Sequence, residues 1–233
     1  MGAFAGPDIS ESGLVLALDA GNPKSYPGTG ATWTDLTNNG RNGTFYNMEI
    51  PGDYASTNGG ILTFDGGNEF VGLSGSSIVV TAATFMAWIR RNGDQSAFAA
   101  ILIGRGTSPT GMNFSGTING SVINKLVYTW NDNGSTYGWA NGPEVPNLTW
   151  CMVAVSVTSS AATAYVFQAS GYDSKVNSIG HSSATLSSIK IAVNDFDSRY
   201  FKGDISQVSV YNRALTAQEI QQNFNATRSR FGI

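Results

Sequence analysis

The segment TFMAWIR, residues 84–90, carries the pattern on which the fold class is decided. Phe85, Ala87 and Ile89 lie on one side of an extended chain, and Met86 and Trp88 lie on the other. Successive side chains of a β-strand point to opposite faces, so this period of two predicts a strand rather than a helix.

The same pattern recurs along the chain, and clusters of Gly, Asn, Ser and Pro separate the apolar runs. Many short strands without intervening helices predict an all-β protein, a jelly-roll sandwich of two antiparallel sheets. The further strand candidates are GLVLALDA (13–20), ILTF (61–64), EFVGL (69–73), KLVYTW (125–130), WCMVAVSV (150–157), TAYVFQ (163–168), SIKIAVN (188–194) and QVSVY (207–211).

One helix is predicted near the C-terminus, in ALTAQEIQQNF (214–224). Thr216 and Glu219 stand three residues apart, as in a capping box, and Leu215 and Ile220 have the spacing of a hydrophobic staple. We expect a short helix from about residue 217 to about residue 226 that packs on the sandwich.

The composition limits the classes of protein that the chain can belong to. Only 12% of its 233 residues are charged and the net charge is -3, which argues against a disordered chain and against a nucleic-acid partner. No apolar run reaches the length of a membrane span, and MGAFAGPDISESG lacks the basic and apolar regions of a signal peptide. We expect one domain over 13–233, preceded by an extended arm over 1–12.

The arm suggests a docking element. Phe4, Pro7 and Ile9 are its candidate anchors against a neighbouring subunit, because a short segment can become ordered at assembly. A dispensable leader is equally consistent with the sequence.

Catalytic patterns are not found. The five glutamates are far apart in sequence, and Asp195 and Asp197 form the only close acidic pair, in a predicted turn. The single histidine, His181, lies in a loop of small residues that we expect to be exposed. Cys151 falls among alternating strand residues and is expected in the core. We therefore predict a protein that is not an enzyme.

A structural calcium ion is a candidate cofactor. Ca²⁺ takes several oxygen ligands, typically from carboxylates and from carbonyls of tight turns. The turn TDLTNNGRNG (34–43) offers such oxygens, but Asn and Asp also occupy turns simply to satisfy backbone donors. The candidate ligands are Asp35, Asn39, Asn42, Asp65 and Asp204.

Carbohydrate binding is the candidate activity of the segment YTWNDNGSTYGWANGP, residues 128–143. Sugar rings stack on exposed aromatic faces that have polar neighbours. Trp130, Tyr137 and Trp139 are the candidate platform, with Asn131 and Asp132 as polar partners. The alternative is a long hairpin whose aromatic side chains alternate into the core.

Several segments, in this order, resemble the laminin-G-like, concanavalin A-like lectin/glucanase domains. The resemblance covers nearly all of the chain from Gly13 onward and is nearest to the versions in virion proteins of tailed bacteriophages, especially cyanophages. The phage likeness lies in the opening, GPDI (6–9) with GLVLALDAGNPKSYPG (13–28), and in the closing FNATRSRFG (224–232). The family segments are SGLVLALDAGNPKSYPGTGATWTDLTNNGRNGTF (12–45), LTFDGGNEFVGL (62–73), TFMAWIR (84–90), TWCMVAVSV (149–157) and FKGDISQVSVYNRALTAQEI (201–220).

The resemblance implies a function and a cofactor. Relatives often hold calcium near the turn that matches residues 34–43, with help from acids that match Asp65 and Asp204. The Glu-x-Asp-x-x-Glu strand of the glycosidase members is missing, and Cys151 replaces the usual histidine of its strand.

We therefore expect a non-enzymatic phage virion surface protein, either a capsid decoration or head-fibre module or a tail-fibre adhesin. Its partners would be other virion proteins, host surface polysaccharide and further copies of itself. The alternatives are a carbohydrate-binding module of a larger glycan-active system, or a glycoside hydrolase.

Overall fold

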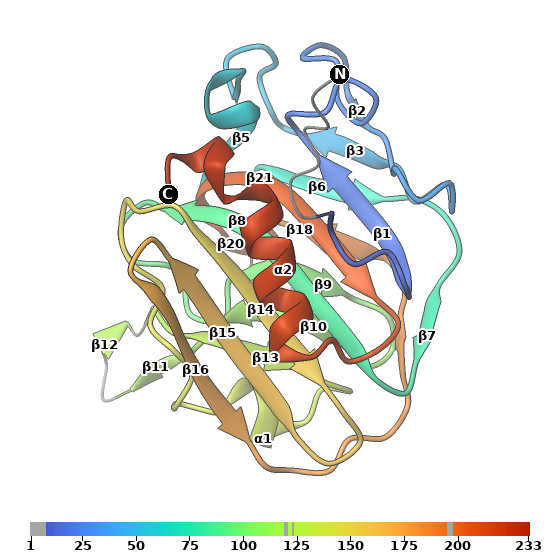
Figure 1. The fold of residues 1–233 in the computed structure, drawn as a ribbon, viewed down its shortest axis with the longest axis vertical. Helices are drawn as coiled ribbons and strands as arrows, with labels where there is room; N and C mark the ends of the chain where they lie inside the picture. Colours follow the sequence, from blue (N-terminus) through green and yellow to red (C-terminus); the bar gives the residue numbers. More distant parts are fainter. Residues whose placement is uncertain (1–7, 119–120, 123, 195–197) are drawn as a thin grey trace, which may run out of the picture.

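A computed structural model describes residues 8–118, 121–122, 124–194 and 198–233. Two large antiparallel sheets pack face to face, and a helix lies across the outer side of one of them (Figure 1). The predicted all-β sandwich with one C-terminal helix is confirmed. Among the helices of these residues, none is long and apolar enough to cross a membrane.

The first sheet has eight strands, in the order β16-β15-β14-β8-β21-β5-β4, and β1 also pairs with β21. All pairings between its strands are antiparallel. Its strands are β1 (Leu14–Asp19), β4 (Tyr54–Ala55), β5 (Ile61–Asp65), β8 (Ala83–Arg91), β14 (Cys151–Val157), β15 (Ala162–Gln168), β16 (Gly171–Asn177) and β21 (Lys202–Tyr211).

The second sheet has seven strands, in the order β13-β10-β9-β18-β6-β3-β2. They are β2 (Thr32–Trp33), β3 (Gly43–Tyr46), β6 (Phe70–Leu73), β9 (Ala100–Gly104), β10 (Thr110–Phe114), β13 (Leu126–Thr129) and β18 (Ile189–Ile191). The remaining described strands form three two-stranded antiparallel pairs: β7 (Ile78–Val80) with β17 (Ala184–Leu186), β11 (Thr117–Ile118) with β12 (Ser121–Val122), and β19 (Val193–Asn194) with β20 (Arg199–Tyr200).

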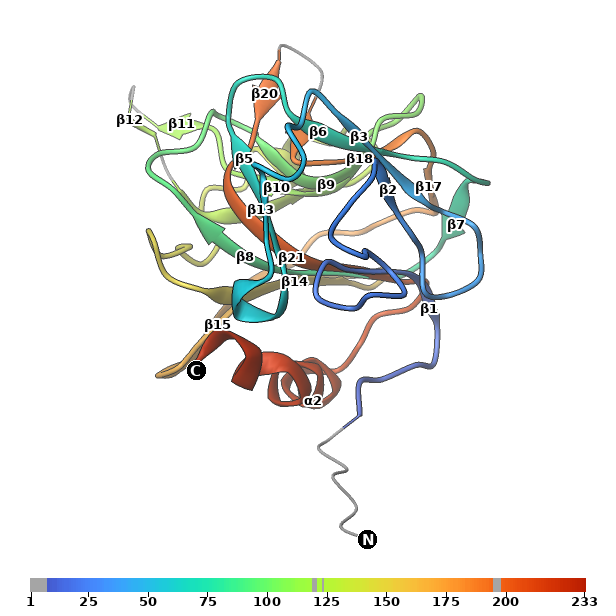
Figure 2. The same ribbon diagram turned by 90° about the horizontal axis from the view of Figure 1, so that it is seen from above.

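The helical segments are short apart from α2. They are η1 (Thr57–Gly59), α1 (Gly134–Tyr137), α2 (Ala217–Thr227) and η2 (Arg228–Phe231). Figure 2 shows α2 on the outer side of the eight-stranded sheet, whereas β11, β12 and β20 lie on the far side of the sandwich.

Strand β8 separates two apolar cores, as the alternation in TFMAWIR predicts. Phe85, Ala87 and Ile89 belong to the core between the sheets. Met86 and Trp88 belong to a second core that lies between the eight-stranded sheet and α2. Both groups are at most 4% exposed, so each face of this central strand is covered by a different layer.

Helix α2 begins with the predicted capping box. The Thr216 hydroxyl accepts a hydrogen bond from the backbone N–H of Glu219, and the Glu219 carboxylate accepts one from the backbone N–H of Thr216. Ile220 and Phe224 turn inward, and the Phe224 ring stacks on Trp88 with centroids 5.5 Å apart. The amphipathic face of the helix thus covers the outer side of the sheet.

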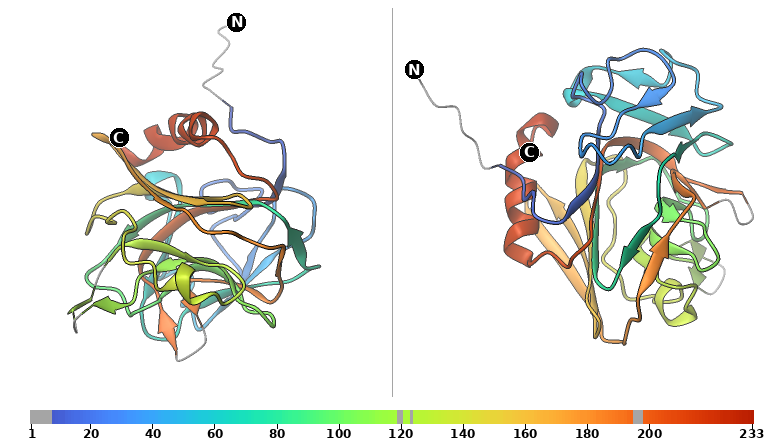
Figure 3. Two further views of the ribbon diagram at one scale, coloured as in Figure 1. Left: turned by 90° about the horizontal axis from the view of Figure 1, so that it is seen from below. Right: turned by 90° about the vertical axis from the view of Figure 1, so that its right-hand side faces the viewer.

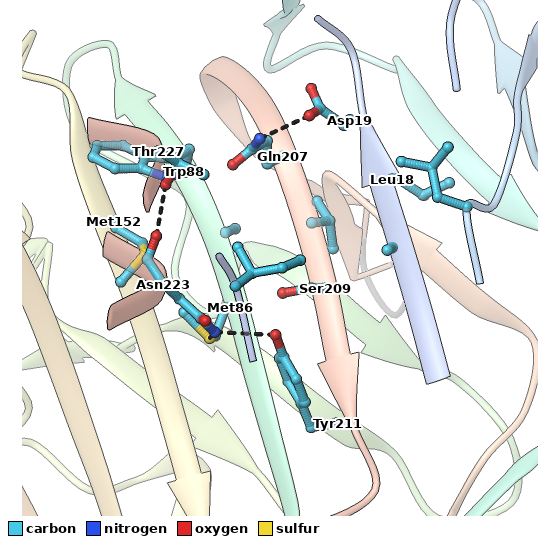
Figure 4. A pocket seen from close by; sticks show the side chains of 15 residues that line it. Leu18, Asp19, Met86, Trp88, Met152, Gln207, Ser209, Tyr211, Asn223 and Thr227 are labelled. Atoms are coloured by element: carbon cyan, nitrogen blue, oxygen red, sulfur yellow. Dashed lines mark hydrogen bonds between the residues drawn. The ribbon is translucent and has the colours of Figure 1, made fainter. Parts of the chain in front are cut away.

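The chain that precedes β1 contacts the same helix (Figure 3). The Ser10 backbone N–H donates to Asn223 Oδ1 at 2.7 Å, and Gln222 Nε2 donates to the Asp8 carbonyl oxygen at 2.6 Å. Ile9 is 39% exposed and lines a cavity of about 100 Å³ beneath α2. Met86 and Trp88 line the same cavity (Figure 4). Docking of the arm to a neighbouring subunit stays a prediction; two of its anchors, Phe4 and Pro7, lie outside the described residues.

Candidate functional site

The outer face of the seven-stranded sheet carries a hollow of about 410 Å³ at its β9 and β13 side. The strand register determines which residues form its floor. Thr129 pairs with Gly111, and Gly111 pairs with Ile103, so the three residues share one face. Their neighbours Tyr128, Met112 and Leu102 lie on the other face, in the core between the sheets. The side chains of Ile103 and Thr129 line the hollow.

The walls of the hollow come from four separate stretches of chain. Phe98 precedes β9, a loop after β9 supplies residues 105–107 and Pro109, and the segment around α1 supplies Asp132 and Tyr137. The β19 and β20 pair supplies Asn194 and Arg199. Residues from distant parts of the sequence therefore meet over one sheet face.

Local backbone geometry holds the α1 wall in place. Asn131 and Asp132 have φ of +50° and +54°, a left-handed conformation that Asn and Asp adopt more readily than other non-glycine residues. Asn133 then caps α1, with its Oδ1 accepting from the Ser135 backbone N–H at 2.9 Å. The Tyr137 ring meets Phe98 edge to face, with centroids 5.8 Å apart. The tyrosine is thereby fixed at the rim of the hollow, partly exposed.

Asn194 is a buried polar residue of the hollow. It is 5% exposed, and its Nδ2 donates to the Phe98 carbonyl oxygen at 3.3 Å. Its Oδ1 has no hydrogen-bond partner in the part of the chain that the structure describes. A buried acceptor without a partner costs free energy, which a hydrogen-bond donor of a ligand could recover after a small local shift.

The lining offers both hydrogen-bonding groups and apolar surface to a ligand. A carboxylate, a carboxamide, hydroxyls and two guanidinium groups surround aromatic and aliphatic surface, and the Arg199 guanidinium lies 4.9 Å from the Phe98 ring centroid. Among the described residues of the lining, Asp132 is the only carboxylic acid. Glycoside hydrolysis uses a pair of carboxyl groups, which these residues do not provide; Asp195 and Asp197 lie outside the described residues.

The structure separates the residues predicted for carbohydrate binding into two groups. Tyr137 and Asp132 line the hollow. Asn131 and Trp139 do not: Asn131 Nδ2 donates to Ser183 and Ser182 oxygens, and Trp139 packs against the core and contacts Tyr128 edge to face.

The prediction that Trp130 belongs to an exposed sugar-binding platform is wrong. Trp130 is 2% exposed, belongs to the core between the sheets and donates its indole N–H to the Ser182 carbonyl oxygen at 2.8 Å. Its ring therefore has no face to offer a sugar. The alternation of Leu126, Tyr128 and Trp130 extends into the loop, which is the alternative that the sequence left open.

His181 also differs from expectation, because it is 8% exposed rather than in an open loop. Its Nδ1 lies 2.9 Å from the Thr158 carbonyl oxygen, so this nitrogen donates, and Nε2 then accepts from the Tyr128 hydroxyl at 2.9 Å. Burial lowers the pKa of His181 and raises that of Tyr128 to about 12. The histidine is a neutral structural residue that links a loop to β13.

Cys151 lies in the core, as predicted. It is fully buried on β14, and burial raises the pKa of its thiol to about 12. A thiol of this kind remains protonated and unreactive at neutral pH.

The predicted calcium turn is closed by its own hydrogen bonds. Asp35 Oδ1 accepts from the backbone N–H groups of Ala17 and Thr37, and Oδ2 accepts from that of Arg41. The Asn42 side chain caps the Asp35 backbone N–H, and Asn39 Nδ2 donates to the Val15 carbonyl oxygen. Donors rather than acceptors face Asp35, so these side chains do not fit a cation site as they stand.

The other two candidate ligands have different partners. Asp204 forms an ion pair with Arg90 at 2.7 Å and accepts from the Thr63 hydroxyl. Asp65 Oδ1 accepts from the backbone N–H of Gly67. Within the described ranges, no three His, Cys, Asp or Glu side chains are grouped as metal ligands. Calcium binding stays a prediction, which the change of melting temperature on chelation tests.

Glu69, from the same FDGGNEF segment as Asp65, is a buried carboxyl. It is 8% exposed, and its Oε2 accepts from the Asp65 backbone N–H at 2.6 Å. Burial raises its pKa to about 7, and the nearby Asp53 and Asp65 carboxyl groups add to this effect. The sequence held one signal for this burial: in EFVGL, Glu69 stands two residues before the fully buried Val71, so a period of two places both on one face.

The two packed sheets, the covering helix and a polar hollow on one sheet face define a lectin-like jelly-roll domain. Residues 65–221 match the family model described as the concanavalin A-like lectin/glucanases superfamily, and the chain belongs to this family. A search of curated protein sequences found no match.

Solved structures share this fold at low sequence identity. Domain 4 of AbnA, a GH43 extracellular arabinanase from Geobacillus stearothermophilus solved with arabinotriose, is 17% identical with a TM-score of 0.58, over 93% of this chain and 100% of that chain. Trypanosoma rangeli sialidase in complex with sialic acid is 15% identical with a TM-score of 0.60, over 98% of this chain. The present chain spans about a third of that sialidase, 35%. The binding domain of Paraclostridial Mosquitocidal Protein 1 is 13% identical with a TM-score of 0.59, over 91% of this chain and 52% of that chain.

Proposed function

We propose that this protein is a non-catalytic carbohydrate-binding domain, whose site is the hollow on the outer face of the seven-stranded sheet. The observation that carries the proposal is the meeting of Tyr137, Asp132 and the buried Asn194 carboxamide in one hollow. An aromatic ring contacts the C–H face of a sugar, and carboxylate and carboxamide groups bind its hydroxyls.

The size of the hollow and one structural neighbour support a saccharide. A volume of about 410 Å³ lies in the range of small-molecule sites. The arabinanase domain, which aligns over its whole length, was solved with arabinotriose. Arabinotriose is therefore the first ligand to test. The single carboxylic acid among the described lining residues supports binding without hydrolysis.

The test is isothermal titration with arabinotriose, followed by a glycan array if no heat is observed. We expect binding to at least one glycan, a loss of affinity of about tenfold in Tyr137→Ala and in Asn194→Ala, and no release of reducing sugar. Tyr46→Ala is the matched control, because Tyr46 is an exposed tyrosine outside the hollow.

Three results would overturn the proposal. One is the absence of binding to every glycan on the array. The second is binding that Tyr137→Ala and Asn194→Ala leave intact. The third is release of reducing sugar, above all if Asp195→Asn abolishes it.

We place this activity on the virion surface of a tailed phage, as a capsid decoration, head-fibre or tail-fibre module that binds host polysaccharide. The support is the resemblance of GPDI (6–9), GLVLALDAGNPKSYPG (13–28) and FNATRSRFG (224–232) to segments of phage virion proteins. Antibody labelling of purified particles tests it. If particles are unlabelled and the domain is found within a larger glycan-active protein, the role as a carbohydrate-binding module of such a system replaces the virion role.

A further inference from the structure

A second hollow, of about 380 Å³, lies on the opposite side of the molecule, between α2 and the edge strand β16. One of its walls is Tyr172, on β16. The other is the exposed side of α2, whose lining residues are Ala217, Gln218, Gln221, Gln222 and Asn225. Figure 1 shows β16 and α2 running along the two sides of β15.

The Tyr172 ring is held in place but remains accessible. Tyr172 pairs with Phe167 across the β15 and β16 strands, and the two rings stack with centroids 4.7 Å apart at an interplanar angle of 27°. Phe167 in turn contacts Phe224 of α2, with centroids 5.2 Å apart. Tyr172 is nevertheless 50% exposed. One face of the ring is therefore packed, and much of the remaining ring surface is open to a ligand.

The helix side of the hollow is lined by carboxamide side chains. Positions 218, 221, 222 and 225 are three or four residues apart, so they share one face of α2. Gln221 Nε2 donates to Asn225 Oδ1 at 3.2 Å, and Gln222 Nε2 donates to the Asp8 carbonyl oxygen. None of the lining residues is charged.

We propose that this hollow is a second saccharide-binding site, specific for neutral sugars. A carboxamide offers both a donor and an acceptor, which matches the dual character of a sugar hydroxyl, and the tyrosine ring offers an apolar surface for a C–H face. An anionic polymer would find no cation in the lining. The volume of about 380 Å³ lies within the range of small-molecule sites.

The two sites lie on opposite faces of the sandwich, because one sheet forms the floor of the first hollow and the other sheet carries Tyr172. Each site can therefore bind its own sugar chain, and no single chain has to reach both. Two separate chains of a surface polysaccharide can be held at once, which raises the apparent affinity for the polymer over that for a short oligosaccharide.

The test is native electrophoresis in gels that contain arabinan, mannan or dextran, with alginate as the anionic comparison. We expect at least one neutral polymer to retard the wild type, and Tyr172→Ala to weaken the second site about tenfold. Gln221→Ala is expected to weaken it in the same direction. The matched control is Tyr46→Ala, because Tyr46 is 47% exposed and stacks on Phe70 with centroids 4.6 Å apart, but lies on the other sheet.

Combining variants distinguishes the two sites. If both exist, Tyr137→Ala and Tyr172→Ala each leave residual retardation and the double variant abolishes it. Loss of all retardation in Tyr137→Ala alone overturns the second site and leaves the first. Retardation that depends on Tyr172 alone overturns the first and leaves the second.

Other outcomes also overturn the second site. These are retardation by alginate only, an equal effect of Tyr46→Ala and Tyr172→Ala, and the absence of retardation by every polymer. A sedimentation coefficient that falls in Tyr172→Ala, without an effect on sugar binding, would assign the surface to contact between copies of this chain. Melting temperatures of all variants verify that they fold.

Discussion

Replacement of Glu69 by Gln is predicted to stabilise the protein at alkaline pH and to have little effect at acid pH. The pKa of this carboxyl is about 7 in the folded protein, against an ordinary value of 4.5. Because the folded-state pKa is the higher one, protonated Glu69 favours folding, and this contribution is complete below pH 4.5 and lost as the pH rises through 7.

The magnitude follows from the separation of the two pKa values. At about 1.36 kcal/mol per pH unit, the whole effect is about 3 kcal/mol, of which about 2.5 kcal/mol falls between pH 5 and pH 8. Glutamine keeps an oxygen that can accept from the Asp65 backbone N–H, and it carries no charge to repel Asp53. The variant should therefore gain about 2 to 3 kcal/mol over the wild type on moving from pH 5 to pH 8.

Urea denaturation of the wild type and Glu69→Gln at pH 5 and pH 8 provides the measurement. Burial lowers the pKa of His181, so this residue makes the free energy of unfolding rise with pH, opposite to the effect of Glu69. The His181 contribution is the same in the wild type and the variant, so the difference between the two proteins isolates Glu69. Glu11→Gln, at an exposed position, is the control and should show no such change. An identical difference in unfolding free energy at both pH values would refute the reasoning about the buried carboxyl.

Three further predictions concern the packing. Phe224→Ala should lower the free energy of unfolding by about 3–5 kcal/mol in urea denaturation, since the ring stacks on Trp88; a loss below about 1 kcal/mol would contradict the second core. Thr216→Ala should cost about 1 kcal/mol by removing the cap of α2, measured in the same way, whereas Thr216→Ser should cost far less. Tyr128→Phe leaves the buried Nε2 of His181 without its donor and should cost about 1–3 kcal/mol; an unchanged melting temperature would show that the hydroxyl is dispensable.

The sequence predicted those parts of the fold whose signal is local. In β8 the alternation of Phe85 and Met86 assigned both faces before any partner strand was known. The capping box at Thr216 likewise predicted where α2 begins. Strand β16 was not predicted, because GYDSKVN lies at the sheet edge, largely exposed, and has no apolar period of two.

The candidate sites were harder to predict from the sequence, because their residues meet through tertiary contacts. Tyr137 and Asp132 were predicted from their Asn-rich, aromatic segment, but Asn194 joins them only through the placement of the β19 and β20 pair. The sequence left open whether Trp130 points outward or into the core, because an indole in such a segment looks the same in either case. His181 was expected in solvent because small neighbours give no sign that Tyr128 covers the ring.

The two-sided burial of β8 has a consequence for aggregation of the protein. Helix α2 covers Trp88, Trp150 and Phe167 on the sheet's outer side, while the core between the sheets does not require the helix. Local opening of α2 would therefore uncover a broad aromatic surface on an otherwise intact sandwich. A variant with a weakened helix should form aggregates while its β-structure still gives a native circular dichroism spectrum.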